Sequence, residues 1–320
     1  MGGGSLFMEK QLISALIPAY NEEECLYELY NRVSAVLSKL EKYDYEILII
    51  NDGSKDKTLE ILTSLNKKDS HVQYVNLARN YGKETAMAAG LDYVKGDVVV
   101  ILDADLQDPP ELIPDMLKYY EEGYDDVYGR RKSRKGETWL KKTTAKIFYK
   151  LLQKSTRVDI LKDTGDFRVL SRRAVEALKQ YKEQRRYTKG FFALIGFKKK
   201  EFLYDRDPRI AGQTKWNYFN LFNLAIEGIT SFSTFPLRLS SLLGLIVAAA
   251  GFIYIIFLVL KTLIFGEPVR GYPTLLSIII FLGGIQLLSL GIIGEYLGRI
   301  FDEVKNRPLY FVEKYSGDDK

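Results

Sequence analysis

Val98-Val99-Val100-Ile101-Leu102-Asp103-Ala104-Asp105 is the stretch of this chain that decides its fold. Five apolar residues in a row are typical of a strand that is buried on both faces of a parallel sheet. Two carboxylates follow this strand directly, and Gln107 adds another oxygen. Such oxygens at a strand end can bind a divalent cation together with a diphosphate. The alternative is a helix-capping turn before Pro109-Pro110, and the context favours the metal site.

The alternation of strand and helix patterns extends over residues 12–128. Apolar runs at 12–17, 45–50, 72–75 and 98–102 alternate with helical spacing at 22–40, 57–65, 81–93 and 110–120, and Val127-Tyr128 begins another strand. This pattern predicts an α/β fold with a mostly parallel sheet that helices cover on both faces.

Ligands of such sheets bind beyond the carboxyl ends of the strands. Three of the expected strands end in polar breaks: Tyr20-Asn21-Glu22, Asp52-Gly53-Ser54 and Asp103-Ala104-Asp105. We therefore expect these three breaks to converge on one ligand site. Asp52 is placed to accept hydrogen bonds from a nucleobase or a ribose, with a plain Asp-Gly turn as the alternative.

Composition limits the chemistry. The 320 residues include one cysteine, Cys25, and one histidine, His71. A disulfide within the chain, a cysteine zinc site and a histidine-rich metal cluster are therefore excluded, and no obvious Ser-His-Asp triad can be built. Any metal must use oxygen ligands, which favours magnesium or manganese. Neither Gly-x-Gly-x-x-Gly nor a P-loop pattern occurs, so a dinucleotide fold and a P-loop are not indicated.

Two long uncharged apolar stretches lie near the C-terminus, at Leu239–Leu260 and Thr274–Gly294. Each has about the ~20 residues that cross a bilayer, so we predict two transmembrane helices within 237–297. An even number of spans places the large domain and the tail, 298–320, on one side. Basic residues of the tail favour the cytoplasm. Glycines in the second span permit close packing within the hairpin or in a homo-oligomer.

The remaining segments complete the expected organisation. Residues 1–7 resemble an added leader with Met8 as the natural start, 8–213 form the globular domain, and the aromatic-rich segment 214–236 lies at the membrane interface. The basic stretch 130–135 runs into a basic amphipathic helix at 139–152, for which membrane contact and plain solvation are equal alternatives. Arg209 and Lys215 could neutralise phosphate, and Asp166 beside Arg168 could be a local ion pair.

Four motifs carry a resemblance to a known family: 18–22 (Pro-Ala-Tyr-Asn-Glu), 51–56 (Asn-Asp-Gly-Ser-Lys-Asp), 103–110 (Asp-Ala-Asp-Leu-Gln-Asp-Pro-Pro) and 164–168 (Thr-Gly-Asp-Phe-Arg). They resemble the motifs of family 2 glycosyltransferases of the dolichyl-phosphate mannose synthase type. Gly294-Glu295-Tyr296-Leu297-Gly298-Arg299, together with the two expected spans, is similar to the bacterial GtrB-like bactoprenol glucosyltransferase branch. The resemblance covers nearly all of residues 12–312.

The resemblance implies a GT-A fold, a nucleotide-sugar donor, a polyprenyl-phosphate acceptor and a divalent metal, Mg²⁺ or Mn²⁺. It implies that the donor nucleotide and its phosphates contact Pro18, Tyr20, Glu22, Asp52, Asp103, Ala104, Arg209 and Lys215. The implied metal ligands are Asp103, Asp105 and Gln107, and the implied catalytic residues are Asp105, Asp166 near the transferred sugar, and Arg131 at the acceptor.

The expected reaction is an inverting, metal-dependent transfer of a hexose to undecaprenyl phosphate at the bacterial inner membrane, for cell-envelope or O-antigen glycosylation. Glucose from UDP-glucose is the best match, and mannose or aminoarabinose transfer is the alternative within the class. A membrane-anchored nucleotide-sugar sensor without turnover is the alternative outside it, and nucleic acid is not an expected partner. Processive synthases carry Gln-x-x-Arg-Trp; Gln184-Arg185-Arg186-Tyr187 has the wrong spacing, which argues against a polymerising enzyme.

Overall fold

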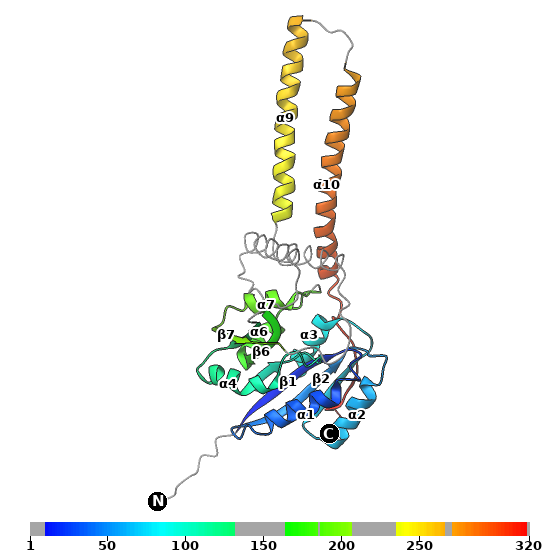
Figure 1. The fold of residues 1–320 in the computed structure, drawn as a ribbon. Helices are drawn as coiled ribbons and strands as arrows, with labels where there is room; N and C mark the ends of the chain where they lie inside the picture. Colours follow the sequence, from blue (N-terminus) through cyan, green and yellow to red (C-terminus); the bar gives the residue numbers. More distant parts are fainter. Residues whose placement is uncertain (1–9, 132–163, 185, 207–234, 266–270, 319–320) are drawn as a thin grey trace, which may run out of the picture. The chain divides into compact units, whose positions relative to one another are not determined.

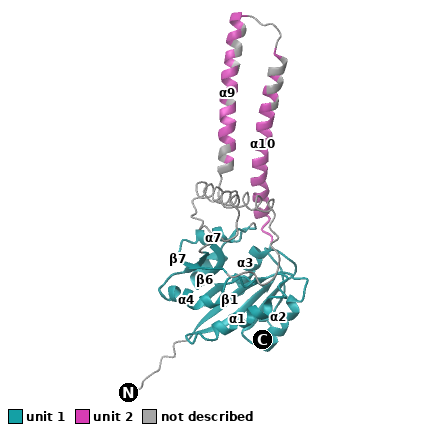
Figure 2. Ribbon diagram, in the orientation of Figure 1, with its two compact units in different colours: residues 1–149, 158–217, 308–320 teal, residues 150–157, 218–307 magenta. Residues whose placement is uncertain are grey.

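The computed structural model describes residues 10–131, 164–184, 186–206, 235–265 and 271–318 (Figure 1). The chain divides into two compact units (Figure 2): unit 1 comprises residues 1–149, 158–217 and 308–320, and unit 2 comprises 150–157 and 218–307. The expected leader, the amphipathic helix at 139–152 and the interfacial segment up to residue 234 lie outside the described residues.

Unit 1 begins with strands and helices in alternation, as predicted. The strands are β1 (Gln11–Ala19), β2 (Tyr43–Asn51), β3 (Val72–Leu77) and β4 (Val98–Ile101). The helices between and after them are α1 (Leu26–Leu37), α2 (Thr58–Lys68), α3 (Lys83–Tyr93), the 3-10 turn η1 (Pro110–Leu112) and α4 (Ile113–Glu121). β1 pairs in parallel with β2 and β4, and β2 pairs in parallel with β3. The mostly parallel α/β sheet is therefore confirmed.

Later segments widen this sheet to eight strands, in the order β7-β5-β6-β4-β1-β2-β3-β8. They are β5 (Asp126–Arg131), β6 (Thr164–Ser171), β7 (Lys199–Tyr204) and β8 (Val312–Tyr315), with helices α6 (Arg172–Lys179) and α7 (Thr188–Leu194). β6 runs antiparallel to β4 and β5, β7 runs parallel to β5, and β8 runs antiparallel to β3. The start of β6 therefore lies at the sheet edge where β4 and β5 end.

The core explains why these segments fold in this way. The central strands β1, β2 and β4 are apolar along most of their length, and Ile13, Leu16, Ile47 and Val100 are fully buried. α1 buries one face, with Leu26, Leu29, Val33 and Leu37 inside. Two-sided burial of the strands and one-sided burial of the helix give the continuous and the periodic apolar patterns of the sequence.

Helices α1 and α3 begin later than their periodicity predicts. α1 starts at Leu26 because the carbonyl of Glu22 first accepts hydrogen bonds from the amides of Cys25 and Leu26 in a turn. α3 starts at Lys83, not at Tyr81, because Gly82 has φ +91° and lies outside the helical region. The backbone geometry of these two turns therefore determines where α1 and α3 begin. The spacing of apolar residues does not reveal this geometry.

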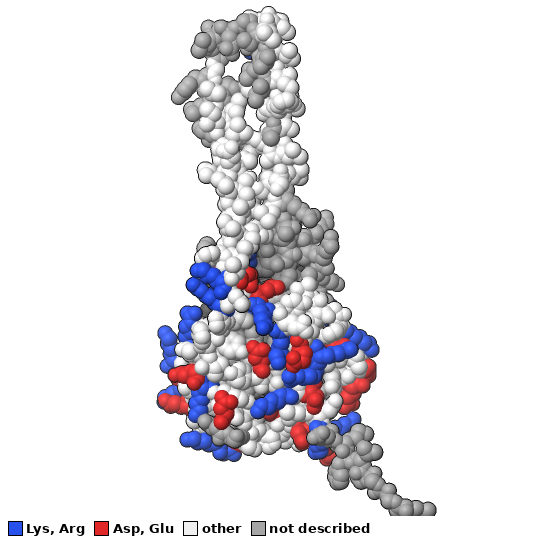
Figure 3. All heavy atoms as spheres, turned by 180° about the vertical axis from the view of Figure 1, so that it is seen from behind, with Lys and Arg blue, Asp and Glu red and all other residues white. Residues whose placement is uncertain are grey.

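Unit 2 contains two long helices, α9 (Phe235–Phe265) and α10 (Tyr272–Val304). The two predicted spans fall inside them. Among the described residues, one stretch, Phe281–Val304, is long and apolar enough to cross a membrane, and the apolar stretch Ser240–Tyr254 is shorter than that. Large apolar side chains of both helices are exposed, for example Ile253 at 67% and Leu287 at 71%. On the face drawn in Figure 3, charged side chains are dense over unit 1 and sparse along these helices.

Candidate active site

The ends of several strands bring the candidate residues to one edge of the sheet. The antiparallel register pairs Ile101 of β4 with Arg168 of β6, so two positions further along Asp103 faces Asp166. The parallel register of β5 and β7 pairs Arg131 with Tyr204 at the same edge. Sheet topology thus gathers Asp103, Asp166, Arg131 and Tyr204, although they are separated by up to about a hundred residues in sequence.

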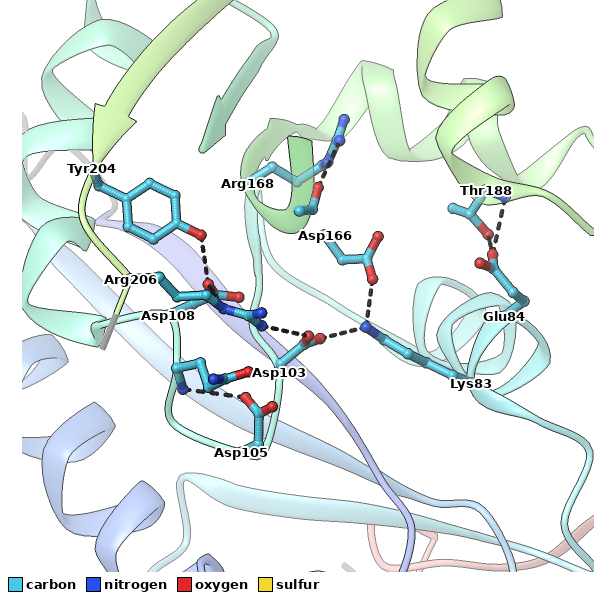
Figure 4. A network of polar contacts seen from close by, with 12 residues as sticks. Lys83, Glu84, Asp103, Asp105, Asp108, Asp166, Arg168, Thr188, Tyr204 and Arg206 are labelled. Atoms are coloured by element: carbon cyan, nitrogen blue, oxygen red, sulfur yellow. Dashed lines mark hydrogen bonds and ion pairs between the residues drawn. The ribbon is translucent and has the colours of Figure 1, made fainter. Parts of the chain in front are cut away.

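A lysine joins the two facing carboxylates (Figure 4). Lys83 is the first residue of α3, and its Nζ lies 2.6 Å from Asp103 Oδ1 and also donates a hydrogen bond to Asp166 Oδ2. Asp166 is 8% exposed. Burial raises the pKa of Asp166, but the charges of Lys83 and Lys189 outweigh burial and lower it well below its usual range. Asp166 is therefore an ionised carboxylate inside the protein.

The segment that follows β4 alternates between buried and half-buried side chains. Asp103, Asp105 and Gln107 are half-buried, whereas Ala104, Leu106 and Asp108 are buried. Leu106 has φ +56°, a conformation that non-glycine residues rarely adopt, and its side chain is 1% exposed in the core. The alternation turns Asp103, Asp105 and Gln107 away from the core. The amide of Gln107 also donates to Asp105 Oδ1 at 3.2 Å, so a turn is present as well.

Asp108 is the centre of a second buried cluster. It is 1% exposed, accepts a 2.5 Å hydrogen bond from the Tyr204 hydroxyl and lies 3.4 Å from Arg206 Nε. Burial and the nearby charge of Asp103 raise the pKa of Asp108, while Tyr204, Arg206 and Arg131 oppose that shift. Arg206 also lies 3.9 Å from Asp103 Oδ2. The two clusters therefore share Asp103.

Asp52, predicted to contact the donor nucleoside, has a different kind of partner. It is 2% exposed, and its two oxygens accept hydrogen bonds from the backbone amides of Tyr81 and Gly82 at 2.7 and 2.9 Å. Burial raises its pKa and these two amides oppose the rise. Asp52 therefore fixes the loop that leads from β3 into α3, and so places Lys83.

The loops after β1 and β2 are tied together at this edge. The amide of Asn21 donates to Ser54 Oγ at 2.9 Å, and Asn21 Oδ1 accepts from the amide of Lys55 at 2.8 Å. Among the residues predicted for the nucleoside here, Pro18 is buried, Glu22 is half-buried and Tyr20 is 37% exposed. Tyr20 thus presents an aromatic ring at the surface, directly after the end of β1.

The predicted alternative for Asp166 is wrong. Arg168 is 2% exposed and pairs with Asp126 Oδ2 at 3.1 Å, whereas Asp166 pairs with Lys83. Successive residues of a strand point to opposite faces, but residues two apart share a face, so burial of each charge rather than spacing selects the partners. Arg209 and Lys215 lie outside the described residues, and their phosphate roles stay predictions.

Sequence reasoning missed Lys83, Arg206 and the role of Asp108. A signal for Lys83 was present, because Arg79-Asn80-Tyr81-Gly82 breaks the chain after β3 just as the other polar breaks follow β1, β2 and β4. The same strand-end rule therefore predicts a contribution from the start of α3. Arg206 follows an edge strand without such a motif, and no sequence signal marks it.

The described residues can bind a divalent metal only if a bound ligand supplies further coordinating oxygens. Within the described ranges, no three Asp, Glu, His or Cys side chains are grouped as a metal site. Asp105 and Gln107 offer a carboxylate and an amide oxygen that face away from the core, and these are ligands that Mg²⁺ and Mn²⁺ accept. Asp103 is engaged by Lys83. The donor set fits a metal that a diphosphate also ligates.

Comparison with known proteins identifies the family of the chain. Residues 14–179 match the family described as "Glycosyl transferase family 2", and residues 235–300 match the "GtrB C-terminal hairpin". The chain is 50% identical to an uncharacterized glycosyltransferase, sll0501, of Synechocystis over 95% of its own length and 96% of that protein's. It is 46% identical to the SfII prophage-derived bactoprenol glucosyl transferase of Shigella flexneri, over 94% and 97% respectively.

Solved structures with a similar fold include glucosyl-3-phosphoglycerate synthase from Mycobacterium tuberculosis in complex with Mn²⁺, UDP-glucose and phosphoglyceric acid. That likeness has a TM-score of 0.48 at 19% identity and covers 69% of this chain and 78% of that one.

The match to the family 2 model and the identity with glycosyl transferases over most of the chain define an enzyme that transfers glycosyl groups. The match of the C-terminal hairpin makes it a membrane-associated enzyme. The chain belongs to glycosyltransferase family 2 and carries the hairpin described for GtrB.

Proposed function

We propose that this enzyme transfers a hexose, glucose in the first instance, from a UDP-sugar to the phosphate of undecaprenyl phosphate. The observation that carries the proposal is the 46% identity with the Shigella bactoprenol glucosyl transferase, which extends over 94% of the chain and so includes both the site and the hairpin. An acceptor with a lipid tail also accounts for a chain in which an α/β sheet domain is joined to two long helices with exposed apolar side chains, because the acceptor itself lies in the membrane.

The chemistry needs no strong base. The second pKa of a phosphate monoester is about 6, so the acceptor is already a dianion at neutral pH. Its oxygen forms a bond to the anomeric carbon while the bond from that carbon to the diphosphate breaks, and the electron pair leaves with the nucleotide. Direct attack inverts the anomeric carbon. The low pKa of Asp166 agrees with a carboxylate that orients the sugar or the acceptor and does not abstract a proton.

The difficulty of the reaction is the approach of two negatively charged groups. When bound at Asp105 and Gln107, Mg²⁺ or Mn²⁺ supplies positive charge to the leaving diphosphate. Arg131, at the end of β5, is the candidate for the acceptor phosphate, because arginine binds phosphate in a bidentate manner. Positioning and electrostatic stabilisation by these residues then account for most of the catalysis.

Strand β8 supports a hairpin that crosses the membrane twice. β8 pairs with β3 in the sheet of unit 1, so residues before α9 and after α10 belong to one folded unit. A folded sheet lies on one side of a membrane, and the number of crossings between its strands must therefore be even. We propose two crossings, one in each helix, with unit 1 in the cytoplasm of a bacterial cell.

The test is a transfer assay with the full-length protein in detergent, undecaprenyl phosphate, Mg²⁺ or Mn²⁺, and a panel of labelled UDP- and GDP-sugars. We expect label from UDP-glucose to enter the organic phase, and we expect a chelator to stop transfer. Transfer from mannose or aminoarabinose donors alone would keep the reaction and replace the sugar. Nucleotide binding without transfer from any donor would overturn the proposal in favour of a sensor.

A further inference from the structure

Lys83 occupies an unusual place for a lysine. It is the first residue of α3, directly after the N-cap Gly82. The N-terminus of a helix carries a partial positive charge, so a cation there is unfavourable unless anions compensate for it. Asp103, after the end of β4, and Asp166, in β6, supply that compensation. A lysine at this position does not stabilise the helix itself. We therefore attribute its position to a role in the active site.

The backbone of Lys83 is fixed on both sides. Before it, the amides of Tyr81 and Gly82 donate to Asp52. After it, the Glu84 carboxylate accepts hydrogen bonds from the amide of Thr188, at 2.9 Å, and from its hydroxyl. The start of α3 is thus tied to the β2 end and to α7, and Figure 4 shows Lys83 extended between the two carboxylates. These contacts fix the backbone from which the Lys83 side chain extends.

The two carboxylates share the ammonium group of Lys83. Asp103 and Asp166 face each other at the sheet edge, and like charges at that separation repel. Asp166 is buried, and its Oδ1 has no hydrogen-bond partner within the described residues, so one of its oxygens is left for a ligand. Lys189 lowers the pKa of Asp166 through its charge, but Lys83 is the lysine that donates a hydrogen bond to it.

We propose that Lys83 is a positioning residue for glycosyl transfer. It joins Asp103 to Asp166, holds Asp166 with one oxygen directed to the transferred sugar, and divides the Asp103-Ala104-Asp105 motif between two tasks. Asp103 belongs with Lys83 and the sugar, while Asp105 is the metal ligand of the motif. This inference rests on the proposed transfer reaction, and the contact between Lys83 and Asp166 can be tested apart from it.

The first test is kinetic. In Lys83→Met we expect kcat for transfer to fall about 100-fold, while the KM for the donor and the Kd for UDP change less than 3-fold. Lys83→Arg should have a kcat at least 10-fold higher than that of Lys83→Met. The double variant Lys83→Met with Asp166→Asn should be no slower than the slower single variant, because both act through one contact. Lys118→Met, an exposed helix lysine that pairs with Asp115 at 2.7 Å, is the matched control and should keep full activity.

The second test needs no turnover. We expect Lys83→Met to lower the midpoint of thermal unfolding, measured by circular dichroism, because the buried Asp166 loses its ammonium partner. We expect the added Asp166→Asn change to recover part of that loss, because the buried carboxylate is then gone. We also expect Mn²⁺ binding with UDP, measured by electron paramagnetic resonance, to survive in Lys83→Met and to be lost in Asp105→Ala. A wild-type enzyme without transfer would sink the proposed function alone. Additive kinetic or thermal effects, or full activity of Lys83→Met, would sink the role of Lys83.

Discussion

Asp52 and Asp166 are both buried carboxylates at the same edge of one sheet, yet they are held in opposite ways. Asp52 accepts two hydrogen bonds from backbone amides, which belong to a loop fixed by the fold. Asp166 is held by the side chain of Lys83 and keeps one oxygen without a hydrogen-bond partner in the described part of the chain. The first arrangement fixes a loop of the site, and the second leaves one carboxylate oxygen for a ligand. Within this pair, backbone amides bind the acid that fixes a loop, and a side chain binds the acid that we propose for catalysis.

The largest effect that this comparison predicts is at Asp166. Asp166→Asn should lower kcat for transfer at least 100-fold, about 3 kcal/mol of transition-state stabilisation, because an amide cannot form the ion pair with Lys83. The affinity for UDP, measured by calorimetry, should change little. An unchanged kcat would remove Asp166 from the site. A large loss of UDP binding would instead place Asp166 in the same structural class as Asp52.

The next effect is at Asp52. Asp52→Asn should lower the free energy of unfolding by about 2 kcal/mol, because one of the two amides loses a charged acceptor in a buried place. UDP binding should weaken as well, since the loop before α3 loosens. Chemical denaturation and calorimetry measure the two quantities, with the exposed Asp115→Asn as control. A variant with full stability and lost turnover would abolish the distinction between the two acids.

Gly53 offers a sharper test of the backbone side of the comparison. It has φ +63°, and an added Cβ would lie 2.3 Å from the carbonyl carbon of Arg79, in the loop that Asp52 holds. Gly53→Ala should therefore lower the free energy of unfolding by about 1 to 2 kcal/mol. Gly123 has φ +87° with nothing within 4 Å of its Cβ position, so Gly123→Ala carries the strain without the clash. Equal losses in the two variants would show that the loop contact contributes nothing.

The smallest predicted effect is at the strand that closes the sheet. Glu313 of β8 accepts a hydrogen bond from Asn76 Nδ2 at 2.7 Å, and Asn76 Oδ1 accepts one from Asn51 at 2.7 Å, next to Asp52. Glu313→Ala should lower the free energy of unfolding by about 0.5 to 1 kcal/mol and leave kcat unchanged. The reason is that the hydrogen bonds from Glu313 through Asn76 to Asn51 stabilise the backbone next to Asp52 and do not reach Asp166. A fall in kcat beyond 3-fold would connect β8 to the chemistry.

The comparison also explains what the sequence could predict. The strand-end acids Asp103 and Asp105 were predictable because a continuous apolar run fixes the strand and topology fixes where it ends. The partner of Asp166 was not, since the pairing of Asp166 with Lys83 depends on the antiparallel insertion of β6 beside β4. Local spacing favoured Arg168, which the structure assigns to Asp126 instead. The pairing register of strands that are distant in sequence therefore determines the ion pairs. The local apolar pattern determines where the helices and strands form.

The membrane segment shows the same division. Uncharged length predicted two apolar helices, and α9 and α10 are both present and longer than the predicted spans. The return of the chain to the sheet as β8 could not be read from sequence, because Val312–Tyr315 is a four-residue strand with two exposed positions. A short edge strand has too few residues for a period of two to be recognised.

The pairing of β8 with β3 also sets an order of assembly. β3 is complete at Leu77, but the amide of Tyr74 finds its partner, Ser316, only 242 residues later, after both long helices have been made. During synthesis at about 5 to 20 residues per second, one edge of the sheet stays open for roughly ten to fifty seconds while the helices enter the membrane. The edge at β3 is therefore covered by β8, which is synthesised only after both long helices. A chain whose synthesis stops within the hairpin keeps β3 as an exposed edge strand that can pair with other chains.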